Sequence, residues 1–174
     1  SHATKGAVPE RRYVELLLQD FEQQGRGLRE RPIRTVFLGG GTPSLFSPEA
    51  IAALLSGVRR LALLPSDVEV TLEANPGAIQ RGRFADYRAG GVTRVSLGAQ
   101  SFNNQHLGML GRIHSADETC AAVAELAAAG IENFNLDLMY GLPEQTPAQA
   151  AAADRRQSSA GRLRQRRQRG CPVR

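Results

Sequence analysis

Three side chains suited to ligand binding stand at or near the ends of strand-like segments: Glu73, Gln100 and Asp137. A glycine run, GGGTP at residues 39–43, directly follows a further strand-like segment. Carboxylates accept hydrogen bonds from ammonium and hydroxyl groups, and an amide both donates and accepts. Glycines leave space for the backbone to approach a ligand. Together these residues predict a site for a small polar ligand at one edge of a sheet.

The glycine run lacks the features of two common phosphate-binding loops. A Walker A loop needs a Gly-Lys-Ser/Thr ending, which is absent, and a G-x-G-x-x-G fingerprint would place its last glycine at Ser44. The run taken alone is equally compatible with a tight turn.

The elements that must position these residues alternate between strand and helix. Short apolar segments predict strands at residues 35–38, 68–73, 94–99 and 133–138. Helical spacing and capping residues predict helices at residues 13–21, 48–63, 80–89, 104–110 and 116–129. This order predicts an α/β fold with a parallel sheet, either open or closing as part of a barrel.

Three of the strands have one apolar and one polar face, because successive side chains alternate. The polar faces carry Thr71 and Glu73, then Ser96, Gly98 and Gln100, then Asn135 and Asp137. Buried polar groups need partners. We therefore expect a wet or ligand-filled cavity at the carboxyl ends of the strands. Two different arrangements remain open: these groups satisfy one another, or they face solvent on an open sheet.

Five motifs in this order, GGGTP, LEANP, LGAQSF, LGRIH and FNLDLMYGLPEQT, resemble the core of oxygen-independent coproporphyrinogen III oxidase and its haem-chaperone relatives. These are radical S-adenosylmethionine (SAM) proteins. The residues of the motifs resemble the chaperone branch more than the oxidase. The resemblance implies a partial (β/α)6 barrel with about four of six units in residues 1–153. It also implies SAM, a [4Fe-4S] cluster, haem and haem-acceptor proteins as cofactors and partners, with porphyrinogen decarboxylation by an oxidase as the alternative.

The resemblance also assigns site residues. Those expected to contact SAM are Gly40, Gly41, Thr42, Glu73, Gln100, Arg112 and Asp137. Within this set, Glu73 would hold the methionine amino group. His114 is expected to form a local hydrogen bond rather than to bind haem iron.

The family's cluster motif, C-x3-C-x2-C, is absent from the sequence, which contains only Cys120 and Cys171. Cys120 is expected to be a small buried side chain, and no metal-ligand set is predicted. The chain is therefore interpreted as an internal fragment. Alone, it is expected to bind no cluster, to leave SAM uncleaved and to be only marginally stable because of its unpaired sheet edges.

The net charge of the 174 residues is +5, but its distribution is uneven. Residues 154–174 hold eight Arg and one Asp, whereas residues 1–153 have 14 basic and 16 acidic side chains. We expect the last 21 residues to be a disordered or non-native basic tail, and we do not expect nucleic-acid binding.

No apolar run is long enough for a membrane span, and a cytoplasmic location is expected. Two further hypotheses are an α/β nucleotide-binding enzyme of an unrelated family and an RNA-binding module that uses the tail.

Overall fold

Four parallel strands form the centre of the computed structural model, which describes residues 9–25, 30–78 and 82–161. Their order in the sheet is the order in the chain. Within the described residues the strands are β1 (Thr35–Leu38), β2 (Glu69–Ala74), β3 (Arg94–Gln100) and β4 (Asn133–Leu138). The predicted α/β class and all four predicted strands are confirmed, with β2 shifted by one residue.

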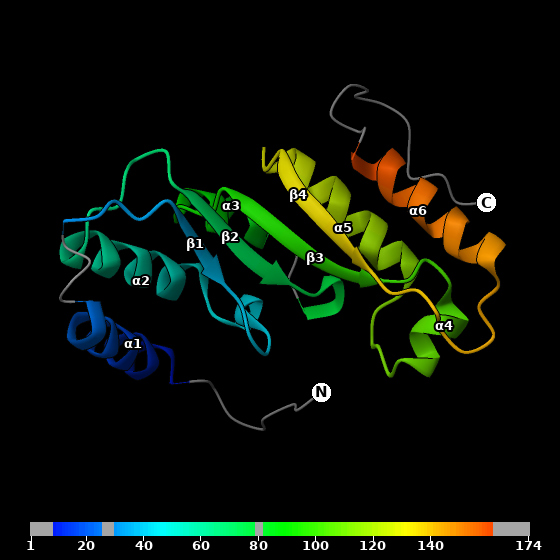
Figure 1. The fold of residues 1–174 in the computed structure, drawn as a ribbon, viewed down its shortest axis with the longest axis horizontal. Helices are drawn as coiled ribbons and strands as arrows, with labels where there is room; N and C mark the ends of the chain where they lie inside the picture. Colours follow the sequence, from blue (N-terminus) through cyan, green and yellow to red (C-terminus); the bar gives the residue numbers. More distant parts are fainter. Residues whose placement is uncertain (1–8, 26–29, 79–81, 162–174) are drawn as a thin grey trace.

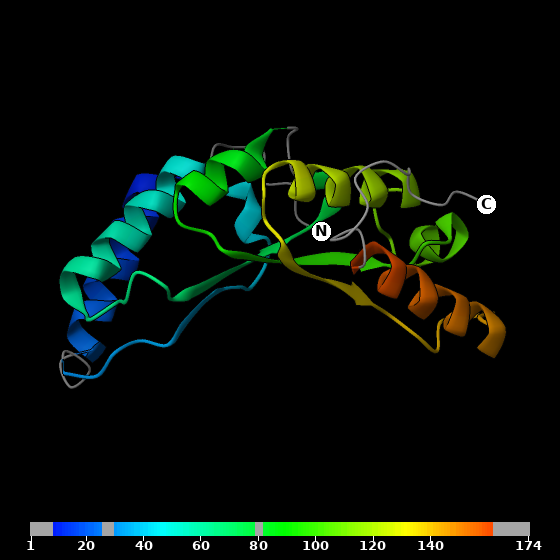
Figure 2. The same ribbon diagram turned by 90° about the horizontal axis from the view of Figure 1, so that it is seen from above.

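Helices connect the strands and lie mainly on one side of the sheet, as Figures 1 and 2 show. The described helices are α1 (Glu10–Gln24), α2 (Pro48–Leu61), α3 (Arg83–Ala89), α4 (Asn104–Met109), α5 (Ala116–Ala128) and α6 (Pro147–Gly161), with two short 3-10 turns, η2 (Pro43–Leu45) and η3 (Pro76–Ala78). In Figure 2, α2, α3 and α5 cover the same face. This arrangement leaves the opposite face of the sheet open among the described residues.

Side-chain caps explain why two of these helices begin where they do. Ser47 Oγ accepts from the Ala50 N–H at 3.2 Å, and Pro48 follows at the first helical position, as predicted. At α5, Ser115 and Glu118 form a reciprocal capping box, which was not predicted from the sequence. The backbone N–H of Ser115, with its hydroxyl, lowers the pKa of Glu118 by bonding to its carboxylate.

The apolar faces of the strands pack against the helices and form the core. Val70, Leu72, Val95 and Leu97 have no exposed surface. The helices contribute buried side chains to the same cluster, which are Ile51, Leu55, Phe84, Tyr87, Ala122, Val123 and Leu126. Burial of each large apolar side chain contributes roughly 1.5–3 kcal/mol. The core therefore fixes which face of each strand points away from the helices.

Helix α6 corrects the prediction for the C-terminal segment. It runs from Pro147 to Gly161, so residues 154–161, expected to be disordered, are helical. They continue a helix that starts upstream and includes the alanine run at residues 150–153, and alanine has the highest helix propensity. Residues 162–174, with Cys171, lie outside the described residues. The division of the chain at residue 153 stays a prediction.

None of the helices within the described part of the chain has the length and hydropathy needed to cross a membrane.

Candidate functional site

The polar side chains of the open face converge on a cavity of about 150 Å³ at the carboxyl ends of the strands. Its lining residues are Gly41, Thr42, Pro43, Glu73, Ala74, Asn75, Ser96, Gly98, Gln100 and Asp137. Five of the seven predicted site residues therefore meet in one place. The volume is below the roughly 300–1,000 Å³ of pockets that enclose a whole small molecule. This cavity fits the polar part of a larger ligand whose remainder lies over its mouth.

The glycine loop borders the cavity and is tied to β2. Gly40 and Gly41 have φ values of +88° and +60°, a backbone conformation that residues other than glycine rarely adopt. The Gly40 N–H donates to Glu73 Oε2 at 3.1 Å. Gly40 does not line the cavity, but this bond places the loop beside the predicted ammonium-binding carboxylate.

A buried phenol holds the segment that follows the glycine loop. The Tyr87 hydroxyl lies near two carbonyl oxygens, that of Phe46 at 2.6 Å and that of Ser44 at 3.0 Å. Tyr87 is fully buried, and desolvation raises its pKa, an effect partly opposed by Arg83. Helix α3 thereby anchors the loop on which Thr42 enters the cavity.

Gln100 reaches the cavity through an unusual backbone conformation. Its φ is +61°, and the pairing of β3 with β4 is irregular between Leu97 and Gln100. Its carbonyl accepts from the Met139 N–H at 2.9 Å, which holds the irregular strand end against the segment after β4. Left-handed backbone at a residue other than glycine costs about 1–3 kcal/mol and often marks a functional site.

Gly98 lies beneath the side chains that the irregular strand end brings together. A Cβ atom at this position would stand 2.9 Å from both Asn75 Oδ1 and Gln100 Nε2. Such distances are too short for ordinary contacts, so the absence of a side chain at Gly98 allows Asn75 and Gln100 to approach. Strand alternation predicts that Gly98 lies on the polar face. It does not predict that Asn75 and Gln100 approach each other over Gly98, where the pairing of β3 with β4 is irregular.

Asp137 is joined to its neighbours by hydrogen bonds on the same face. Ser96 Oγ donates to Asp137 Oδ2 at 2.7 Å, and Asn135 Nδ2 donates to Asp137 Oδ1 at 2.6 Å. The arrangements considered for the polar face therefore combine: the groups partly satisfy one another, the sheet is open, and a cavity remains at its carboxyl edge.

Arg112, like Gly40, is a predicted site residue that does not line the cavity. It follows α4, is half-buried, and its backbone N–H donates to the Leu107 carbonyl at 2.9 Å. Nearby, the buried His114 ring lies with Nε2 3.1 Å from the carbonyl oxygen of Ala99 on β3, 15 residues earlier in the chain, so its hydrogen bond is not local in the sequence as predicted. The assignment of Arg112 to a ligand stays a prediction.

Five further lining residues were not among the predicted site residues. These are Pro43, Ala74, Asn75, Ser96 and Gly98. Asn75 Nδ2 lies 3.5 Å from Thr42 Oγ1 and so links β2 to the glycine loop. The sequence contains signals for two of these residues, since Asn75 directly follows a strand and Ser96 alternates with apolar residues. Neither an asparagine nor a serine identifies a ligand by itself.

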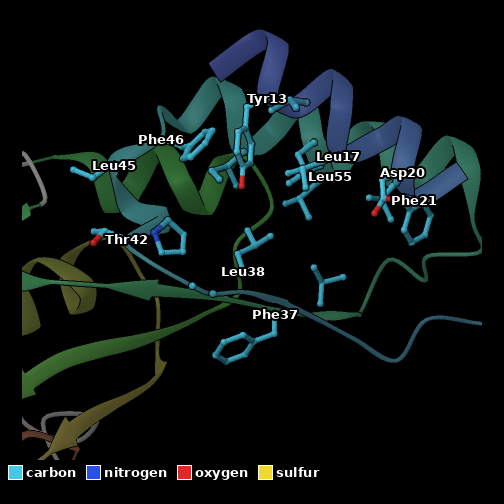
Figure 3. A pocket seen from close by; sticks show the side chains of 18 of the residues that line it. Tyr13, Leu17, Asp20, Phe21, Phe37, Leu38, Thr42, Leu45, Phe46 and Leu55 are labelled. Carbon is cyan, nitrogen blue, oxygen red and sulfur yellow. The ribbon is translucent and has the colours of Figure 1, made fainter. Parts of the chain in front are cut away.

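A larger cavity, of about 780 Å³, lies between α1, α2 and β1 (Figure 3). Leu17, Leu38 and Leu55 point into it, whereas Phe37 lies on the other side of β1. Its lining is predominantly apolar, with few convergent polar groups. It lacks the carboxylate and amide chemistry of the smaller cavity, which we therefore take as the candidate site.

The described residues do not fit an iron–sulfur cluster. No group of three or more His, Cys, Asp or Glu side chains with metal-binding geometry occurs among them. Cys120 lies on α5 and is half-buried, whereas a buried side chain was expected. The helix turns one side of this residue away from the core.

Comparison with protein families gives a match to the radical SAM superfamily over residues 3–155. The haem chaperone HemW of Escherichia coli is 46% identical over 158 residues, which are 91% of this chain and 42% of the relative. HemW of Haemophilus influenzae is 45% identical over 154 residues, covering 86% of this chain and 40% of the relative. The chain thus spans about two fifths of the length of these curated relatives.

Solved structures give the same fold. Coproporphyrinogen III oxidase (HemN) from Escherichia coli, described as a radical SAM enzyme, matches with a TM-score of 0.79 and 27% identity, over 90% of this chain and 36% of the other. The archaeal Elp3 of Methanocaldococcus infernus, with a TM-score of 0.60 and 20% identity, supports the fold alone. The family match excludes an unrelated α/β nucleotide-binding fold, and this chain belongs to the radical SAM superfamily.

Proposed function

We propose that this chain forms the SAM-binding part of a haem chaperone. The observation that carries the proposal is the convergence of Glu73, Gln100 and Asp137 with the glycine loop on one polar cavity. Two carboxylates and no Lys or Arg are present among the lining residues. Such a site favours a ligand with positive charge and hydroxyl groups, and SAM carries an ammonium, a sulfonium and a ribose.

Each element has a distinct task in this proposal. Glu73 accepts hydrogen bonds from the ligand's ammonium group and is held in place by the Gly40 N–H. The glycine loop presents backbone N–H and C=O groups at the cavity rim. Gln100 and Asp137 supply polar contacts from β3 and β4. The described residues contribute binding and orientation of SAM, whereas any radical chemistry belongs to the cofactor.

The chaperone branch is favoured over the oxidase by sequence similarity. The identity is 46% to the HemW chaperone of Escherichia coli and 27% to the coproporphyrinogen oxidase of the same organism. We expect the intact protein to bind haem, which is measured by the visible absorbance of haem. We expect it not to convert coproporphyrinogen III. Turnover of that porphyrinogen would instead favour the oxidase.

Calorimetric titration of the chain with S-adenosylhomocysteine and with SAM tests the binding proposal. Glu73→Gln keeps the size of the side chain but removes its charge. We expect it to weaken SAM binding by roughly tenfold or more, because a charge-assisted hydrogen bond contributes about 1.5–3 kcal/mol.

Glu132→Gln is the matched control, since Glu132 is exposed and lies before β4, outside the cavity. We expect it to bind like the unmodified chain. Circular dichroism verifies that both variants fold. Equal affinities for Glu73→Gln and the unmodified chain, or tighter binding of a dinucleotide than of SAM, would contradict the proposal.

A further inference from the structure

We propose that Ser96 and Asn135 are positioning residues that hold the Asp137 carboxylate in one orientation for a pair of ligand hydroxyl groups. The inference rests on the proposed function, because it concerns the ribose of the ligand that the cavity takes. It gives a role to Ser96, which lines the cavity, and to Asn135, which lies beside it on β4 outside the lining. In this role both residues act through the Asp137 carboxylate.

Each carboxylate oxygen of Asp137 has its own donor. Ser96 Oγ lies 2.7 Å from Oδ2, and Asn135 Nδ2 lies 2.6 Å from Oδ1. The two donors come from different strands, since Ser96 and Asn135 are directly paired between β3 and β4. Two donors on two oxygens define the plane of the carboxylate, which one donor would leave free to rotate.

The orientation of Asn135 is determined by Arg94. The guanidinium Nη2 of Arg94 bonds to Asn135 Oδ1. Arginine can only donate, so the amide oxygen of Asn135 must face Arg94 and its NH2 group must face Asp137 and Ser96. Asn135 Nδ2 is accordingly 3.1 Å from Ser96 Oγ as well. Arg94 itself is steadied by Thr71 Oγ1, 3.3 Å from Nη1.

Asp137 needs such support because it is exposed. β4 pairs with β3 on one side and with no other described strand, whereas Ser96 is only 7% exposed. An unsupported exposed carboxylate would populate several rotamers. Each carboxylate oxygen can accept more than one hydrogen bond, and Asp137 lines the cavity together with Gly98 and Gln100. A carboxylate in this state can accept from two neighbouring hydroxyl groups.

The experiment compares ligands that differ in one hydroxyl group. S-adenosylhomocysteine and its 2′-deoxy and 3′-deoxy forms are titrated into the unmodified chain and into Ser96→Ala. We expect Ser96→Ala to weaken S-adenosylhomocysteine binding by about fivefold to tenfold. Each deoxy form has lost one of the two hydroxyl groups held by Asp137, so we expect Ser96→Ala to weaken its binding by only about twofold, since part of the contact is already missing.

Two variants complete the design. Ser96→Thr keeps the hydroxyl and is expected to restore binding to within about twofold. Thr119→Ala is the control for loss of a buried hydroxyl, because Thr119 is fully buried on α5 and bonds to the Ser115 carbonyl, away from the cavity. A Ser96→Ala effect of equal size on all three ligands would show a merely structural role and overturn the inference.

A readout without ligand separates this inference from the proposed function. In the unliganded chain, nuclear magnetic resonance of the Asn135 side-chain NH2 group should change on Asp137→Asn and on Ser96→Ala but stay the same on Thr119→Ala. Unchanged Asn135 signals in both variants would overturn the positioning role. Changed signals with no binding of S-adenosylhomocysteine would overturn the proposed function and the hydroxyl assignment, while supporting the held carboxylate.

Discussion

On the helix-facing side of the sheet, Leu72 and Leu97 have no exposed surface, whereas on the other side Glu73 is half-buried and Asp137 is exposed. Leu72 and Glu73 are neighbours in the chain. One face consists of apolar contacts with helices, and the other of hydrogen bonds between polar side chains around a cavity. Alternate residues of one strand can therefore separately determine stability and binding.

The sharpest test of this separation is Leu72→Ala. The variant removes a fully buried side chain from the centre of the core and should lower the free energy of unfolding by about 2–5 kcal/mol. Urea denaturation followed by circular dichroism measures the change. Glu73→Gln, one residue further on, should change it by less than about 0.5 kcal/mol, as expected for partly exposed substitutions. If Glu73→Gln lowered the free energy of unfolding by more than about 2 kcal/mol, the polar face would determine stability as the apolar face does.

Gly98→Ala tests whether the open face tolerates added volume. Its methyl group would lie 2.9 Å from Asn75 Oδ1 and from Gln100 Nε2, so one of them must move. We expect a stability loss of about 1–3 kcal/mol, typical of overpacking, together with weaker SAM binding. Denaturation and calorimetry measure the two effects. Gly108→Ala, where a Cβ would meet no atom within 4 Å, is the control.

Tyr87→Phe examines the contact between the helix layer and the glycine loop. Loss of the hydroxyl bonded to the Ser44 and Phe46 carbonyls should lower stability by about 1–2 kcal/mol at neutral pH. Burial raises the pKa of Tyr87 in the folded state, so folding favours the protonated phenol. This contribution is complete below about pH 10, the unfolded value, and is lost as pH rises through the folded value.

Thermal melts between neutral and strongly alkaline pH check both parts of this expectation. The unmodified chain should lose stability above about pH 10 more steeply than Tyr87→Phe does. Identical alkaline slopes for the two proteins would indicate that Tyr87 ionises as freely in the folded chain as in the unfolded one.

The strands and the identity of their faces could be predicted from the sequence, because alternation within β2, β3 and β4 is local and the core enforces it. The helix start at Ser47 and the end of α5 before Gly130 follow from equally local rules. Five site residues were brought together as expected because the carboxyl ends of parallel strands share one edge.

Long-range geometry was not predictable. The left-handed backbone at Gln100 arises from irregular pairing with β4, and nothing in LGAQSF marks it. The hydroxyl of Tyr87 meets carbonyls more than forty residues away in the chain. Arg112 belongs to a motif, but a motif does not state where its side chain lies. Helix α6 was missed because its propensity is not accompanied by an apolar stripe.

The pairing of Ser96 with Asn135 has a consequence for how sequences of this kind can vary. If β4 slipped by one residue, Leu136 would face the cavity and Asp137 would enter the apolar core. The misplaced charge would unfold the protein before any loss of ligand affinity mattered. Selection for stability alone therefore preserves the register of the carboxylate, and mutations can explore new ligands on the open face without losing the alignment of the strands.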